Sequence, residues 1–108
     1  MITIKKGEDY TKYLHMEYAE SGDPADLTGC LVFSQMRDGP GGKLLATAQC
    51  STTAQNGDIW VTFGSDITSQ LTPGNAGYDI WLVENGVKHP IYTATCKIID
   101  AYTEDFGE

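Results

Sequence analysis

Apolar side chains recur at every second residue along most of this sequence. In DIWVTF, for example, Ile59, Val61 and Phe63 lie on one side of an extended chain, and YDIWLV and KHPIYTATCKII show the same spacing. Successive side chains of a β-strand point to opposite faces of a sheet, whereas an amphipathic helix repeats every 3.6 residues. The alternation therefore predicts a chain built from half-buried strands.

Clusters of turn-forming residues separate these segments. Asn85-Gly86 is typical of a tight hairpin, and Gly39-Pro40-Gly41-Gly42 is expected to close another, between strands at 32–37 and 44–51. Only SDITSQL, residues 65–71, could form a helical turn, with Ser65 as its cap and with Ile67 and Leu71 facing the core. About seven to eight strands at this spacing predict an all-β, antiparallel sandwich.

One domain accounts for the length. Among 108 residues we expect a single sandwich over residues 1–101, followed by an acidic tail over 102–108. LTPGNAGYDIWLV looks like the corner of immunoglobulin-like domains where a tyrosine hydroxyl bonds to the upstream backbone, so Tyr78 is expected to form a tyrosine corner. The alternative is that Tyr78 is an ordinary aromatic residue of a strand.

The charge balance limits the partners. The chain has 15 acidic and 7 basic residues, a net charge of −8, and its basic residues are scattered. A protein that tracks the phosphates of nucleic acid needs clustered Lys and Arg, so neither nucleic acid nor an anionic membrane is expected as a partner. No apolar run is long enough to span a bilayer, and no signal peptide is expected after MITIKKGEDY.

Catalytic and cofactor motifs are not found in the sequence. There is no GxSxG, no phosphate-binding glycine loop, no HExxH and no EF-hand spacing, and His15 and His89 are interpreted as exposed strand residues. We therefore expect no enzyme, no cofactor and no metal. Glu20, Asp23 and Asp26 could converge on calcium in one loop, but solvated turn acids are the simpler interpretation.

Three widely spaced cysteines, Cys30, Cys50 and Cys96, form no CxxC pair. They are interpreted as small, buried, reduced residues, and a disulfide between two of them is the alternative.

Two tryptophans are out of phase with the apolar residues of their strands. Trp60 alternates with Ile59 and Val61, and Trp81 alternates with the apolar set of YDIWLV. If those sets face the core, both tryptophans face outward and mark a protein contact on one sheet. The alternative is that both faces are partly covered, or that one of them is the core tryptophan of the sandwich. A second candidate contact is the first strand, with Ile2 and Ile4, because edge strands pair readily with other chains.

The connector ESGDPADLTG, residues 20–29, lies between two strands. Gly22-Asp23-Pro24 is expected to make the turn, and Asp26 and Thr28 to bond local backbone amides. Leu27 is expected to fill one end of the sandwich, and Gly29 to adopt a backbone conformation that other residues avoid.

Three stretches of the chain resemble a known family. The first is KKGEDYTKYLHMEYAESGDPADLTGCLVFSQMR, the second is GDIWVTFGSDITSQLTPGNAGYDIWLV, and the third is the closing ENG hairpin with its long last strand. Together they resemble the N-terminal domain of the baseplate upper protein family of bacteriophage tails. The residues that correspond to the motifs of the first stretch are Lys6, Gly7, Glu8, Asp9, Tyr10, Gly22, Asp23, Pro24, Asp26, Leu27, Thr28 and Gly29.

The resemblance implies an immunoglobulin-like sandwich with a structural, non-enzymatic role in a phage or prophage particle. Its place would be the tail, baseplate, neck or head, and its partners would be other virion proteins or further copies of itself. The protein would be made in the cytoplasm of the bacterial host and end in the virion. The alternative is a carbohydrate- or ligand-binding sandwich, with or without calcium, because exposed Trp and Tyr residues suit stacking on sugars.

Overall fold

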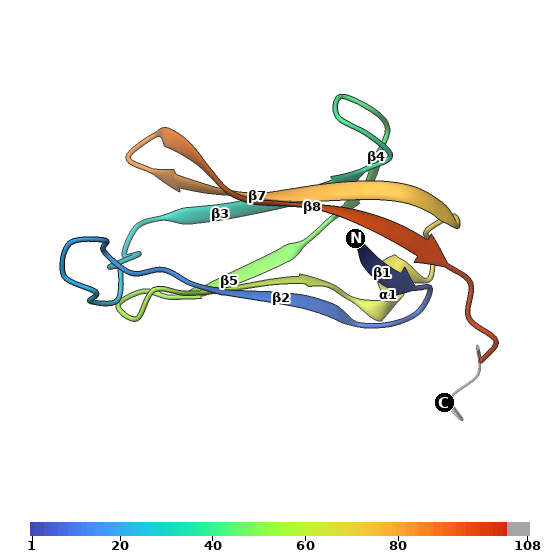
Figure 1. Ribbon diagram of the computed structural model, residues 1–108, viewed down its shortest axis with the longest axis horizontal. Helices are drawn as coiled ribbons and strands as arrows, with labels where there is room; N and C mark the ends of the chain where they lie inside the picture. The colour runs from blue at the N-terminus through green and yellow to red at the C-terminus, as the bar shows by residue number, and fades with distance from the viewer. Residues whose placement is uncertain (104–108) are drawn as a thin grey trace.

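Two β-sheets packed face to face make up the computed structural model, which describes residues 1–103 (Figure 1). The elements, in chain order, are β1 (Ile2–Lys5), β2 (Tyr10–His15), β3 (Leu31–Arg37), β4 (Leu44–Thr47), β5 (Gln49–Thr53), β6 (Asp58–Phe63), α1 (Ser65–Thr68), β7 (Gly74–Glu84) and β8 (Val87–Ile99). The single helical turn and the predicted strands are confirmed, except for the extent of the strand expected at 44–51. Most of the predicted tail, residues 104–108, lies outside the described residues.

The five-stranded sheet has the order β1-β8-β7-β3-β4, and the three-stranded sheet has the order β2-β6-β5. All neighbours are antiparallel except β1 and β8, which run parallel. In immunoglobulin-type sandwiches the strands B, E and D share one sheet and G, F and C the other, and here β2-β6-β5 and β8-β7-β3 take these places. The predicted fold class is confirmed. Within residues 1–103, no helix is long and apolar enough to cross a membrane.

The core lies between the two sheets and follows the alternation of the sequence. Ile59, Val61 and Phe63 of β6 are fully buried, and they face the apolar set of β7, in which Ile80 is also fully buried. Burying such side chains is the main favourable contribution to folding, at roughly 1.5–3 kcal/mol for each.

The predicted strand 44–51 is wrong in its extent. β4 ends at Thr47 in the five-stranded sheet, and β5 begins at Gln49 in the three-stranded sheet. Ala48 lies between them and donates a backbone hydrogen bond to the Ser34 carbonyl oxygen, 3.0 Å. The alternation of apolar residues does not reveal where a chain passes from one sheet to the other, because the strands on both sides have the same two-residue period.

Tyr78 is buried, but its partner differs from the prediction. Its hydroxyl lies 2.7 Å from the Tyr10 hydroxyl of β2, so the hydrogen bond crosses the sandwich instead of returning to the upstream backbone. The rings of Tyr10, Phe63 and Tyr78 also pack together, with centroids 5.5 to 6.5 Å apart. Burial raises the pKa of Tyr78 strongly, which keeps the phenol protonated. The tyrosine-corner prediction is therefore wrong in its hydrogen bond.

The helical turn α1 is not capped by Ser65. Gly64 occupies the N-cap position, and the backbone amide of Ser65 donates to the Asp9 carboxylate, 2.7 Å. Leu71 is buried and Ile67 packs against the core, as the sequence predicts. The fully buried side chain of this turn is Thr68, whose hydroxyl donates to the Glu8 carbonyl oxygen, 2.6 Å.

The connector between β2 and β3 has the predicted positions of Leu27, Gly29 and Asp26, but the Thr28 hydroxyl bonds the Asp26 carboxylate instead of a backbone amide. Leu27 is 3% exposed, and Gly29 has a φ of +78°, in the left-handed region. Asp26 accepts hydrogen bonds from the amide and the hydroxyl of Thr28, and these bonds hold the pKa of Asp26 below its usual range. The segment is a strand connector with its acids turned to local backbone and solvent.

Candidate interaction surfaces

The two tryptophans lie on different sheets. Trp60 is on β6 of the three-stranded sheet, and Trp81 is on β7 of the five-stranded sheet. Each alternates with buried neighbours, so both lie on outer faces and both are half-buried. The prediction that they point outward is confirmed, and the prediction of one shared contact sheet is wrong. The sandwich therefore has two separate candidate surfaces.

The outer face of the five-stranded sheet carries an apolar patch. On β3, Leu31 is 58% exposed and Phe33 is 53% exposed, and the register places them opposite Val83 and Trp81 of β7. Pro90 of β8 lies on the other side of Trp81. We call these five residues the apolar patch. Large exposed apolar patches of this kind mark interaction sites in soluble proteins.

A groove of about 850 Å³ adjoins the apolar patch. Phe33 and Trp81 contribute to its wall, and Gly77, Asp79 and Thr95 continue it along β7 and β8. The β3–β4 loop, which stands above the sheet in Figure 1, contributes residues 38–41. The lining is mainly apolar, with Arg37, Asp38 and Asp79 as charged groups, so the groove extends the patch along the same face.

The first strand is at the edge of the five-stranded sheet, as the sequence suggests. However, Ile4 is fully buried and Ile2 packs against the core. Ile4 cannot supply a side-chain contact to a partner. What β1 offers at its free edge is backbone.

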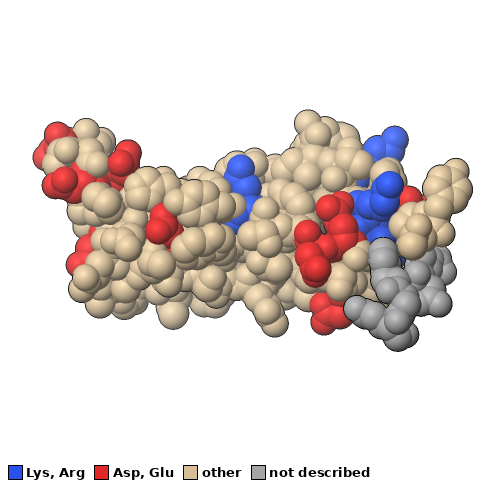
Figure 2. Space-filling model, turned by 90° about the horizontal axis from the view of Figure 1, so that it is seen from below, with Lys and Arg blue, Asp and Glu red and all other residues tan. Residues whose placement is uncertain are grey.

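The outer face of the three-stranded sheet is more polar than the apolar patch on the five-stranded sheet. Figure 2 shows that its middle holds mostly uncharged residues, with charged groups gathered toward the two ends. The register brings nine outward residues into three rows. They are Thr11, Thr62 and Gln49 in the first row, Tyr13, Trp60 and Ser51 in the second, and His15, Asp58 and Thr53 in the third. We call them the hydroxyl-rich face.

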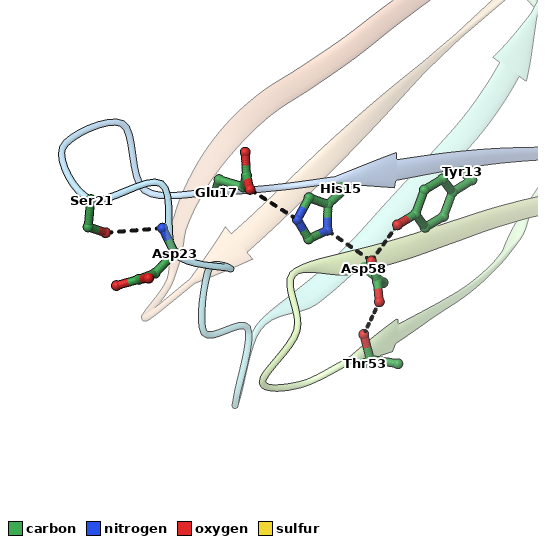
Figure 3. A network of polar contacts seen from close by, with 7 residues as sticks. All are labelled: Tyr13, His15, Glu17, Ser21, Asp23, Thr53 and Asp58. Atoms are coloured by element: carbon green, nitrogen blue, oxygen red, sulfur yellow. Dashed lines mark hydrogen bonds and ion pairs between the residues drawn. The ribbon is translucent and has the colours of Figure 1, made fainter.

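Asp58 organises one end of the hydroxyl-rich face (Figure 3). Its carboxylate accepts hydrogen bonds from the Tyr13 hydroxyl at 2.5 Å, from His15 Nδ1 at 2.9 Å and from the Thr53 hydroxyl at 3.0 Å. Glu17 lies 3.6 Å from the other nitrogen of His15. The bonds from Tyr13 and His15 hold the pKa of Asp58 below its ordinary value. The three partners of this carboxylate thus come from two strands, β2 and β5, on either side of β6.

Asp58 in turn is expected to set the protonation of His15. The hydrogen bond to Asp58 raises the pKa of His15 above its ordinary 6.5. A raised pKa in the folded state stabilises the protein at pH values below the ordinary pKa, and this contribution is lost as the pH rises through the raised value. Asp58→Asn should return the pKa of His15 toward 6.5, measured by NMR titration of its ring protons.

Thr53→Val is the matched control for that titration. It removes another partner of the Asp58 carboxylate and leaves the charge beside the imidazole in place, so the pKa of His15 should stay raised. Equal pKa values of His15 in the wild type and in Asp58→Asn would contradict the assignment.

The remaining candidates do not converge on a site. Among residues 1–103, no three His, Cys, Asp or Glu side chains lie together as metal ligands would, and Glu20, Asp23 and Asp26 are included in that range. All three cysteines are free thiols; Cys96 is buried, while Cys30 and Cys50 are half-buried. Burial raises the pKa of each thiol, which disfavours the reactive thiolate.

Two groups of surface residues were not identified from the sequence. Leu31 and Phe33 alternate with Val32, Ser34 and Met36, and the period alone cannot tell which of these sets is exposed. Because serine is usually exposed, Ser34 would suggest that the set of Val32, Ser34 and Met36 faces solvent, whereas the structure buries Ser34 and Met36. His15 and Asp58 meet only through the pairing of β2 with β6, which no local signal reveals.

Comparisons with known proteins give a likeness of fold to solved structures. No protein-family model matches the chain, and no curated protein matches it. Among solved structures, it is similar to the N-terminal domain of phage TP901-1 ORF48, with a TM-score of 0.44 and 14% sequence identity, over 93% of this chain and 83% of that chain. At this identity the likeness concerns the fold alone.

Proposed function

We propose that this protein is a non-enzymatic structural module of a phage or prophage particle, which assembles through protein–protein contacts. The observation that supports the contact is the apolar patch, where Leu31 and Phe33 are each more than half exposed beside Trp81. The particle itself is inferred from the resemblance of three sequence stretches to the baseplate upper protein family.

The composition of the apolar patch suits a protein partner. Aromatic residues at the centre of an interface account for much of its binding energy when polar groups surround them. Here Phe33 and Trp81 are paired across β3 and β7, while Arg37, Asp79 and Lys88 lie outward on the same sheet. The groove next to the patch offers a depression into which a side chain or a segment of a partner fits.

The partner is a further copy of this chain or a neighbouring protein of the particle, and the site of action is the virion. The acidic net charge of −8 keeps free subunits from associating at random, because like charges repel. Specific assembly then depends on the apolar patch overcoming that repulsion.

A charge placed in the apolar patch should prevent assembly. In Phe33→Asp, an unpaired carboxylate would be buried in each contact, and association should weaken at least about 30-fold, which corresponds to about 2 kcal/mol. The measurement is light scattering of the purified protein over a concentration series, together with pull-down of virion proteins from an infected or induced host.

Ser51→Asp is the matched control, because it places the same charge on the outer face of the other sheet. It should assemble like the wild type. A wild-type protein that stays monomeric at high concentration and captures no virion protein would overturn the proposal, and so would equal assembly of wild type and Phe33→Asp.

A further inference from the structure

The hydroxyl-rich face has features that the assembly proposal does not use. Its centre is the aromatic pair Tyr13 and Trp60, whose ring centroids are 5.5 Å apart with an interplanar angle of 42°. Around the pair lie hydroxyl, amide and carboxylate groups from all three strands. We propose that this face binds a neutral saccharide, stacked on Tyr13 and Trp60 and hydrogen-bonded by the polar residues beside them.

The aromatic pair forms an open surface for stacking. A pyranose ring has a face of C–H groups that is apolar, and an exposed aromatic ring is the matching surface in water. Tyr13 is 48% exposed. Ser51, opposite Trp60 on β5, is exposed and small, so the register places no bulky side chain on that side of the indole.

The position of Tyr13 is fixed before any ligand arrives. Its hydroxyl donates to Asp58, which also holds His15 and Thr53 (Figure 3). A side chain that is already ordered loses less conformational entropy on binding, which favours affinity at an open, shallow site.

The polar groups around the pair match the edge of a sugar. Sugar hydroxyls both donate and accept hydrogen bonds, and the hydroxyl-rich face offers groups of both kinds: Thr11, Gln49, Ser51, Thr53, Asp58 and Thr62. Asp58 Oδ2 accepts one bond, from Thr53, and a carboxylate oxygen has room for a second. Asp58 is therefore positioned to accept from a sugar hydroxyl next to the stacked ring.

The chemistry of this face favours a saccharide over a protein. Among the described residues, Tyr13 is the one large, strongly exposed hydrophobic side chain of the hydroxyl-rich face, whereas Leu31 and Phe33 lie on the opposite sheet. A protein contact needs aliphatic and aromatic anchors that exclude water, and this face is instead mostly hydroxyl groups. Asp58 and Glu17 at one end, with the net charge of −8, disfavour an anionic polymer.

The test is titration with neutral hexasaccharides, namely maltohexaose, cellohexaose and chitohexaose. At least one should change the tryptophan fluorescence saturably, with a Kd of about 0.1–10 mM, and should show transfer of NMR saturation from the protein to its ring protons. Tyr13→Ala, on an exposed edge strand, should weaken binding at least about tenfold. Trp60→Ala should abolish the saturation transfer.

Trp81→Ala is the matched control, because it removes the other outward tryptophan and should leave saccharide binding unchanged. Circular dichroism and thermal melting of each variant show whether it is folded, and Tyr13→Phe, which keeps the ring and loses the bond to Asp58, should bind between wild type and Tyr13→Ala. The proposal is overturned if none of the three sugars binds, if Tyr13→Ala binds like the wild type, or if Trp60→Ala instead dissociates an oligomer. Because the two candidate surfaces are on opposite sheets, failure here leaves the assembly proposal intact.

Discussion

Replacing Phe63 with alanine is expected to lower the free energy of unfolding by about 3–5 kcal/mol. Phe63 is fully buried between the sheets, and its ring packs against those of Tyr10 and Tyr78. The substitution removes this packing and leaves a cavity that the neighbouring strands cannot fill. For a domain with a typical stability of about 5–15 kcal/mol, the loss is a large share of the total.

Urea denaturation measures this effect as a shift of the midpoint at constant slope. Phe33→Ala is the matched control, since Phe33 is the same residue type on the outer face and is 53% exposed. It should change the stability by less than about 1 kcal/mol. A loss of less than 1 kcal/mol for Phe63→Ala would contradict the position of Phe63 at the centre of the core.

The second large effect is expected at Gly57, in the turn between β5 and β6. Its φ of +71° strains any other residue, and a Cβ built there overlaps the Met16 carbonyl oxygen and comes within 3.0 Å of the Ala25 amide nitrogen. These backbone groups form two bonds: Met16 N–H donates to Gly57 O at 2.8 Å, and Ala25 N–H donates to Met16 O at 2.9 Å. Gly57→Ala should lower the free energy of unfolding by about 3 kcal/mol or more, because strain and displacement of the bonded backbone add.

Gly86→Ala separates the two causes. Gly86 has a φ of +78°, but a Cβ there meets nothing within 4 Å, so its substitution should cost only the backbone strain, about 1 kcal/mol. Both variants are compared by the same denaturation measurement. Equal losses at the two positions would show that Met16 does not restrict the turn.

The period of two predicts well which residues of a strand share a face. It identified the buried set of β6 and the outward positions of Trp60 and Trp81, because a strand has only two sides. It could not assign the tryptophans to sheets, since alternation describes one strand and pairing joins strands that are far apart in sequence. For the same reason, alternation did not predict the change of sheet at Ala48 or the hydrogen bond between His15 and Asp58.

Local sequence motifs predicted hydrogen-bond partners less reliably where a group from a distant part of the chain can form the hydrogen bond instead. Ser65 has the residue type of a helix cap, yet Asp9 supplies the carboxylate that accepts from its amide. Tyr78 has the sequence context of a tyrosine corner, yet Tyr10 is the partner of its hydroxyl, 68 residues away along the chain. In both cases the sequence indicates a polar group that needs a partner, and only the packed sheets determine which partner is in reach.

The parallel pairing of β1 with β8 has a consequence for synthesis in the cell. Ile2 pairs with Cys96 and Ile4 with Ile98, so the edge of the five-stranded sheet joins the first strand to the last. At a translation rate of about 5–20 residues per second, β1 waits on the order of 5–20 seconds for its partner to leave the ribosome. During that interval Ile4, fully buried in the finished sandwich, is without its cover on β8. The first strand therefore leaves this apolar side chain uncovered until β8 has emerged.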